Sequence, residues 1–534
     1  MRQKTPIQLY LIAGVLLLCM AGMVIRLAAV QRGDQVAAAS VRQGKYHLHV
    51  PISSGTFYDR TMRPINNTED TILAVVSPTP DTLASLFTKL RDRDEVTAQL
   101  QRVSPFVCTL TDEAEPTPNL LIYHGKENAS GILPAQHLLG YRQNGKAVSG
   151  LERAFSGWLS ECDTSADITF TVSGRGEVLP GADSDVVRCG MPGGGVVTSL
   201  DLDIQRIAEK ALQTAAPHAG AAIVLDCQTG EIRACASTPV YDTEHLSDAL
   251  NDPLSPFLNR ALSPYSVGSV FKLVTAAAAM ENGISDQYMY SCEGYTTIYG
   301  QTFRCHKWDG HGLLNMEDAM VASCNPYFIS LSQIMTPEIM HDTAESLGFG
   351  SEICLADGLS SDAGYLPTAD ELKIEAEKAN FSFGQGKLTA TPLQIAAMTA
   401  CIANGGIYHT PQLVTGLTAN SREIQDYGER NETRVLQPET ASALQRMMRA
   451  VIYKSDSSKA KPANITAAGK TSTAQTGRFD ADGSEYCHAW MTGFFPAYHP
   501  RYTVTVLIEN GGSGNQAAAP VFREIIEQIT RSVR

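Results

Sequence analysis

Three short motifs lie far apart in the C-terminal half of the chain, and one active site would have to bring them together. They are Ser269-Val270-Phe271-Lys272, Ser323-Cys324-Asn325 and Lys470-Thr471-Ser472-Thr473. A serine and a lysine three positions apart share one face of a helix. A lysine that is desolvated in an apolar cleft can lose its charge and act as a base. The ordered set therefore indicates a serine acyl-transferase that works without a histidine triad.

Each motif taken alone also has a purely structural interpretation. Ser269 could be a helix cap, Asn325 could form an Asx turn before Pro326, and Lys470 could be a solvated lysine on an edge strand. A second Ser-x-x-Lys begins at Ser458 in a polar run before a proline, and we expect it to be loop. The order of the three motifs and their local contexts favour the functional interpretation.

The motif set resembles that of the penicillin-binding protein transpeptidases, and more closely the class B enzymes that crosslink peptidoglycan. The resemblance is continuous from about residue 196 to the C-terminus and looser before it. Further segments that carry it are Thr198-Ser199-Leu200-Asp201 with Gln205, Asn259-Arg260-Ala261, Ser382 to Gly386, Thr391 to Gln394, Glu509 to Gly512 and, more loosely, Tyr58-Asp59-Arg60 and Gly150 to Arg153.

The resemblance implies a role for each catalytic residue. Ser269 is the expected nucleophile and Lys272 its base. Ser323 would relay a proton between Lys272 and the leaving amine, and Asn325 would bind the substrate backbone and orient Lys272. Lys470 would supply positive potential beside the cleft. We expect no metal ion and no organic cofactor in this reaction.

The third motif is expected to bind the substrate. The hydroxyls of Thr471 and Thr473 would bind the terminal carboxylate of a D-alanyl-D-alanine stem, and the N–H groups of Ser269 and Thr473 would form the oxyanion hole. Ser472 stands where the family usually has glycine, which lets the substrate backbone lie flat on the strand. The serine is therefore expected to tune specificity or drug affinity. Val267 stands where the family often has proline.

The chain has 534 residues, which suits two or three domains. An uncharged apolar run from Leu9 to Ile25 can just cross a bilayer and follows Arg2 and Lys4, which favours a cytoplasmic N-terminus. A cleaved signal peptide is the alternative, and Ala37-Ala38-Ala39 leaves it open. The predicted domains are a cytoplasmic tail at 1–6, a transmembrane anchor at 7–27, a loop-rich, mainly β pedestal resembling a dimerisation domain at 28–195, and a transpeptidase domain at 196–534.

Periodicity places the secondary structure of the C-terminal half. We expect a helix around Ile204 to Leu212, and another that Ser269 opens and that ends near Gly283. Pro520 is expected to start a final helix. Expected strands are 221–226 and 231–237 as a hairpin, then 465–476, 490–497 and 501–509. The elements fit an α/β sandwich with a central antiparallel sheet, the fold that the resemblance implies.

Twelve cysteines are many for an exported chain. Cys292 and Cys305 flank Tyr295 to Phe303, which is expected to be a hairpin turning near Gly300, so they form a candidate disulfide. The other cysteines are expected to be small buried residues. His306, His311 and His488 have no zincin-type spacing and the cysteines show no C-x-x-C, so we expect no metal site.

The net charge of −14 argues against nucleic acid as a partner. The expected function is a D,D-transpeptidase that acts on peptidoglycan stem peptides and is acylated by β-lactams. Its expected partner is a SEDS-type membrane glycosyltransferase, and its catalytic part would lie outside the cytoplasm. The alternatives are a D,D-carboxypeptidase or β-lactamase, a β-lactam sensor and a non-catalytic scaffold. The sequence does not distinguish elongation, division and sporulation.

Overall fold

The computed structural model divides the chain into two compact units, each described here by itself. It describes residues 7–32, 44–94, 97, 103–129, 131–143, 145–215, 219–428, 430–455 and 457–532. Arg2, Lys4, the predicted tail and alanines 37–39 lie outside these residues. The first unit comprises residues 1–54, 67–127 and 163–192, and the second comprises 55–66, 128–162 and 193–534. The domain boundaries drawn from the sequence stay predictions.

The N-terminal helix α1, Ile7–Arg32, contains a candidate membrane span. Its segment Tyr10–Ala29 has 20 residues and a mean hydropathy of 2.4. In the described part of the chain it is the one helix long and apolar enough to cross a bilayer. This finding fits the predicted membrane anchor.

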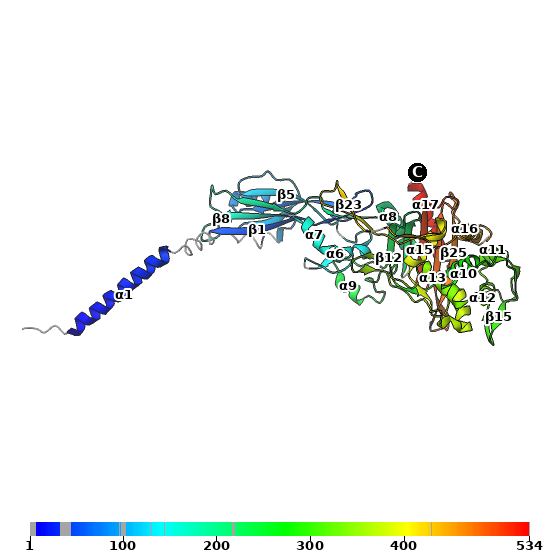
Figure 1. The fold of residues 1–534 in the computed structure, drawn as a ribbon. Coiled ribbons are helices and arrows are strands. Elements are labelled where there is room, and N and C mark those ends of the chain that lie inside the picture. The colour runs from blue at the N-terminus through cyan, green and yellow to red at the C-terminus, as the bar shows by residue number, and fades with distance from the viewer. Residues whose placement is uncertain are drawn as a thin grey trace, which may run out of the picture. The chain divides into compact units, whose positions relative to one another are not determined.

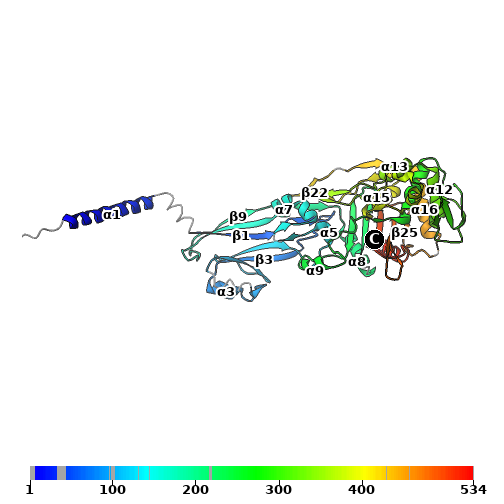
Figure 2. The ribbon, with the colours of Figure 1, turned by 90° about the horizontal axis from the view of Figure 1, so that it is seen from below.

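A six-stranded sheet forms the first unit, with strand order β4-β3-β5-β1-β8-β9. Its strands are β1 Lys45–Ser53, β3 Glu69–Val76, β4 Phe106–Leu110, β5 Leu120–Glu127, β8 Thr164–Thr171 and β9 Asp185–Cys189. Figure 2 shows β1, β3 and β9 running along one another, with the short helix α3, Pro80–Leu86, beside β3. Successive side chains point to opposite faces, so Ala74 packs with Leu86 of α3 whereas Val75 packs with Val50.

The second unit is built on a five-stranded antiparallel sheet in the order β12-β11-β27-β26-β25. The strands are β11 Gly220–Asp226, β12 Ile232–Thr238, β25 Ala468–Phe479, β26 Glu485–Phe495 and β27 Tyr502–Ile508. Helices α8, Leu202–Ala215, and α17, Ala518–Ser532, cover one face and lie next to each other (Figure 1). Their apolar sides bury alanine, valine and isoleucine side chains of β11 and β27.

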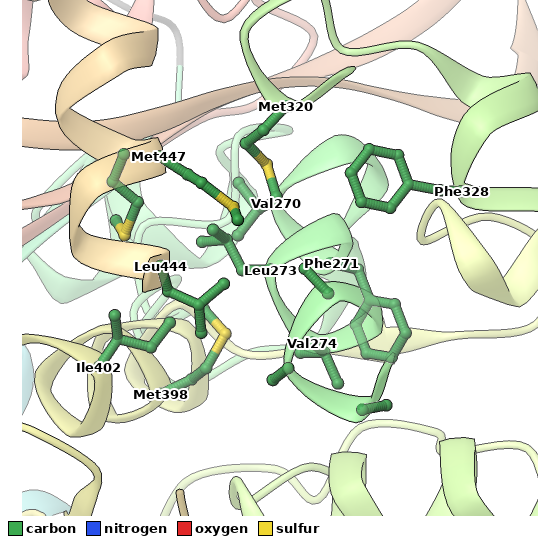
Figure 3. Packing of buried hydrophobic residues seen from close by; sticks show 14 of the residues in the cluster. Val270, Phe271, Leu273, Val274, Met320, Phe328, Met398, Ile402, Leu444 and Met447 are labelled. Atoms are coloured by element: carbon green, nitrogen blue, oxygen red, sulfur yellow. The ribbon is translucent and has the colours of Figure 1, made fainter. Parts of the chain in front are cut away.

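The opposite face of this sheet carries the helices that position the first motif. Helix α15, Pro392–Ala403, is buried at every position and begins with a capping box between Thr391 and Gln394. Helices α10, Lys272–Glu281, and α16, Pro438–Tyr453, pack with it. Figure 3 shows Leu273 of α10, Met398 of α15 and Leu444 of α16 meeting in this core. The helix that follows the first motif is therefore buried in the core between α15 and α16.

Shorter elements complete the second unit. A four-stranded sheet has the order β2-β10-β22-β23. The buried carboxylate of Asp59 accepts from Arg63 Nε at 2.9 Å and from the backbone N of Leu202 at 3.3 Å, which ties residues 55–66 to this unit. The helices are α5 Gln136–Leu139, α6 Gly150–Ala154, α7 Ser156–Cys162, α9 Leu246–Asn251, α11 Met316–Val321, α12 Asn325–Ile334, α13 Pro337–Ser346, α14 Glu375–Ser382 and the 3₁₀ turns η1 Gly268–Phe271 and η2 Glu371–Lys373. The strands are β2 Thr56–Tyr58, β6 Arg142–Gln143, β7 Lys146–Ala147, β10 Gly195–Thr198, β13 Tyr265–Ser266, β14 Tyr290–Cys292, β15 Tyr295–Ile298, β16 Gln301–Arg304, β17 Gly312–Leu314, β18 Cys354–Ala356, β19 Leu359–Ser360, β20 Thr389–Ala390, β21 Ile407–His409, β22 Val414–Thr418, β23 Ile424–Asp426 and β24 Glu432–Arg434.

The expected α/β sandwich with a central antiparallel sheet is confirmed. The predicted hairpins are present as β11–β12 and as β15–β16, which turns at Tyr299 and Gly300. The last helix begins at Ala518, two residues before Pro520. Ser269 differs from expectation, because it lies inside a 3₁₀ turn that precedes α10 and does not cap the α-helix itself.

Candidate acyl-transfer site

The candidate nucleophile stands on a tight turn. Ser269 is the second residue of η1, and Gly268 before it has a φ of 63°, in the left-handed region that favours glycine. A side chain at position 268 would also meet Ser472 Oγ at 2.4 Å. Ser269 is half-buried, and its hydroxyl makes no hydrogen bond with any residue that the structure describes. The hydroxyl is therefore available for a reaction.

The three residues before Ser269 are each held by a hydrogen bond with another part of the second unit. The bonds run from Trp490 Nε1 to Ser266 O at 2.9 Å, from Ser472 Oγ to Val267 O at 2.9 Å and from Gly268 N to Gly384 O at 2.8 Å. Strands β25 and β26 supply two of these donors, so the central sheet fixes the position of the turn.

Lys272 connects the first motif to the second. It is fully buried, and its Nζ donates to Ser323 O at 2.7 Å, to Ser323 Oγ at 3.2 Å and to Asn325 Oδ1 at 2.7 Å. The ammonium also lies 5.6 Å from the centre of the Phe328 ring. Asn325 begins α12, and Ser323 precedes it with a φ of 50°, a strained value for a serine.

Lys470 of β25 reaches the same serine from the other side. Its Nζ donates to Ser323 Oγ at 3.1 Å and to Thr471 O at 2.9 Å, and the side chain is almost completely buried. The structure therefore brings Lys272, Ser323, Asn325 and Lys470 into one network, with the Ser323 hydroxyl between the two ammonium groups.

Burial lowers the pKa of both lysines. Removal from water is the main cause for Lys272, whose pKa lies well below its usual value, and the nearby charge of Lys470 lowers it further. Burial lowers the pKa of Lys470 to about 7. Because the two groups share one hydroxyl, they do not titrate independently. A lowered pKa favours the neutral amine of Lys272 that a general base requires.

The remaining predicted residues lie on β25 outside this network. Ser472 lies two residues after Lys470, on the same side of the strand, and is buried. Its hydroxyl donates to Val267 O. Thr471 and Thr473 occupy the other side of the strand; Thr471 is half-buried and Thr473 is exposed. The Thr473 hydroxyl accepts from Gly514 N at 3.3 Å.

Two residues that the sequence offered only as landmarks support the site. Arg260 is buried, and its Nε donates to Glu509 Oε1 at 2.9 Å. Tyr265 donates its hydroxyl to the same oxygen at 2.5 Å. The charge pair joins the segment that leads to the nucleophile to the end of β27, and no local sequence pattern showed that these two landmarks meet.

A cluster of cysteines lies next to the second motif. Cys292 and Cys305, the candidate disulfide, are both free thiols in the structure, so their pairing stays a prediction. They converge with His311 and with Cys324, the middle residue of the second motif. The sequence predicted no metal site here, because the spacing of these residues matches no short ligand motif.

Comparisons with known proteins identify the family. The penicillin binding protein transpeptidase domain matches residues 220–527. Penicillin-binding protein PbpB of Mycolicibacterium smegmatis is 28% identical over 485 residues, which cover 86% of this chain and 73% of that protein. Peptidoglycan D,D-transpeptidase PbpA of Mycobacterium tuberculosis is 31% identical over 369 residues, covering 63% of this chain and 72% of that protein.

Solved structures have the same fold. One, of a complex described as a peptidoglycan synthase that coordinates polymerization and crosslinking, has a TM-score of 0.70 and 24% identity and covers 98% of both chains. Another, penicillin-binding protein A from M. tuberculosis as a ceftriaxone acyl-enzyme, has a TM-score of 0.64 and 25% identity, covering 78% of this chain and 95% of that one. Since the domain match spans more than half of the sequence, this chain belongs to the penicillin-binding protein transpeptidase family.

Proposed function

We propose that this protein is a peptidoglycan D,D-transpeptidase that crosslinks stem peptides through an acyl-enzyme on Ser269. The observation that carries the proposal is the buried network that joins Lys272 to Ser323 and Lys470, because Lys272 follows Ser269 by one helical turn of the chain. Family membership and the relatives named as peptidoglycan D,D-transpeptidases support the same reaction class.

Acylation is the first half of the reaction. Ser269 Oγ attacks the carbonyl carbon of the penultimate D-alanine while its proton passes to neutral Lys272 Nζ. The peptide bond to the last D-alanine breaks, and the leaving nitrogen takes a proton through the Ser323 hydroxyl, which lies 3.2 Å from Lys272 Nζ. The products are free D-alanine and an ester on Ser269.

Transfer to an amine is the second half. An amine of a neighbouring stem attacks the ester carbonyl, gives up a proton by the same route and restores the Ser269 hydroxyl. β-Lactams acylate the same oxygen, with the ring amide bond in place of the peptide bond. The N–H groups of Ser269 and Thr473 stabilise the oxyanion, each donor being worth about 10²–10³ in rate. Lys470 and the hydroxyls of Thr471 and Thr473 bind the terminal carboxylate, and Ser472 supports the strand from beneath.

The rest of the chain anchors and presents this site. In the proposal, residues 7–27 span the membrane with 1–6 in the cytoplasm, 28–195 form the pedestal and 196–534 the transpeptidase domain outside the cell membrane. Helix α1 has the length and hydropathy for the span. The related synthase complex combines polymerization with crosslinking, which supports a SEDS-type membrane glycosyltransferase as the partner of this chain.

Covalent labelling tests the proposal. The purified protein is incubated with fluorescent penicillin and the label is mapped by peptide mass, beside Ser269→Ala. Ser458→Ala is the matched control, because it changes the serine of the other Ser-x-x-Lys, which lies in a loop. We expect a stable adduct on Ser269 in the wild type and in the control. Absence of an adduct on folded protein refutes the acyl-enzyme, and loss of the adduct within seconds indicates a hydrolase.

A further inference from the structure

Four metal-ligating side chains converge beside the second motif although they come from four separate points of the sequence. They are Cys292, Cys305, His311 and Cys324, and their ligand atoms all lie within 4.8 Å of one another. The three cysteines are buried and the histidine is half-buried. We propose that these residues bind one Zn²⁺ ion and that the ion positions the second motif; this last step rests on the proposed function.

The distances suit a single tetrahedral ion. Zinc bonds of about 2.3 Å to sulfur and about 2.0–2.1 Å to nitrogen put two ligand atoms of a tetrahedron about 3.6–3.8 Å apart. Cys305 Sγ and His311 Nδ1 are separated by 3.4 Å. The full set therefore needs shifts of about 1 Å or less to close on one ion. Three thiolates and an imidazole form a ligand set used by structural zinc sites.

The backbone is shaped to bring the ligands together. Cys292 ends β14, which pairs with β17 so that Cys292 lies opposite Gly312, next to His311. A side chain at Gly294 would meet Trp308 O at 2.0 Å, and one at Gly310 would meet Cys292 O at 2.3 Å. Only glycine permits this close approach of the two segments. The pairing of β14 with β17 and the close contact of residues 292–294 with residues 308–310 therefore bring the ligands together, in addition to the hairpin β15–β16.

Cys324 connects the proposed ion to catalysis. It is the N-cap of α12 and lies between Ser323 and Asn325, both of which bind Lys272 Nζ. Ser323 is held at a φ of 50°, and such a backbone persists only where its surroundings fix it. A metal bond to Cys324 Sγ fixes the residue adjacent to this strained serine. Cys324 is thus a positioning residue.

Binding is balanced in charge and protons. Zn²⁺ replaces the thiol protons of three cysteines, which pass to solvent, while His311 binds as the neutral imidazole through one ring nitrogen. The site then carries a net charge of −1. His306 lies close by, with its Nδ1 3.9 Å from Cys305 Sγ, but it does not belong to the group of four.

Metal analysis of the full-length protein, purified in detergent without chelator or reductant, tests the site. We expect about one zinc per chain in the wild type, and loss of most of it in Cys292→Ala and His311→Ala. Cys401→Ala is the matched control, since Cys401 is a buried cysteine of α15 outside the cluster, and it should keep its zinc. Substitution by Co²⁺ should give the intense bands of tetrahedral thiolate coordination.

Two results overturn the site: folded protein without zinc that also fails to take up Co²⁺, or peptide masses that show a disulfide between Cys292 and Cys305. The positioning step has its own readout. Acylation of Ser269 by penicillin should shift the Co²⁺ bands, and removal of zinc should slow acylation until Zn²⁺ is restored. If neither effect occurs while zinc is bound, the ion has no link to catalysis. Zinc content does not depend on acylation, so failure of the metal site and failure of the proposed function are distinguishable.

Discussion

Replacement of Ser472 by glycine restores the residue usual in the family, and we expect it to impair this protein. The Ser472 hydroxyl donates to Val267 O at 2.9 Å and its side chain is buried. Loss of one such bond, as in Ser472→Ala, costs about 1 kcal/mol of unfolding free energy. Glycine inside a strand costs roughly 0.5–1 kcal/mol more than alanine. Ser472→Gly should therefore lower the free energy of unfolding by about 2 kcal/mol, which corresponds to a decrease in Tm of no more than about 4 °C.

The same bond orients the turn that carries Ser269, so acylation should slow as well. If the whole hydrogen-bond energy of about 1 kcal/mol is needed to orient the turn, its loss would lower the second-order rate constant of penicillin acylation by at most about fivefold. Stopped-flow acylation and thermal unfolding of wild type, Ser472→Ala and Ser472→Gly measure both effects. Faster acylation by Ser472→Gly at unchanged Tm would contradict the reasoning, because it would place the serine side chain in the path of the substrate.

Three further predictions concern the buried charges. The pKa of Lys470 is about 7 and the reaction requires its positive charge, so the rate of acylation of the free enzyme should decline as pH rises through 7. Lys470→Arg stays charged at these pH values, so it should abolish the alkaline decline even if it lowers the rate of acylation. Lys272→Gln should slow acylation of Ser269 by at least about 10²-fold, measured with fluorescent penicillin, whereas an unchanged rate would exclude Lys272 as the base. Glu509→Ala leaves the buried Arg260 guanidinium without this carboxylate, so the free energy of unfolding measured with denaturant should fall by about 3–5 kcal/mol. A decrease below about 1 kcal/mol would contradict this assignment.

The sequence predicted those features that depend on local pattern. The strands of the central sheet, the hairpin turning at Gly300 and the helix after Ser269 follow from periodicity and turn residues. The hydrogen bond from Ser472 Oγ to Val267 O could not be predicted, because it depends on where the turn before Ser269 lies and not on the local pattern of the strand. The convergence of Cys292 with His311 was missed for a similar reason, since it requires the pairing of β14 with β17.

The strand order of the second unit also has a consequence for how the protein is made. Strand β27, at residues 502–508, lies between β11 and β26, so the middle of the sheet is among the last parts to be synthesised. Residues 220–226 pair early with β12, but their second partner lies almost three hundred positions downstream. Such distant pairing slows folding and leaves strand edges exposed. A chain truncated before residue 502 would lack the centre of its sheet, so this truncation should prevent the unit from folding.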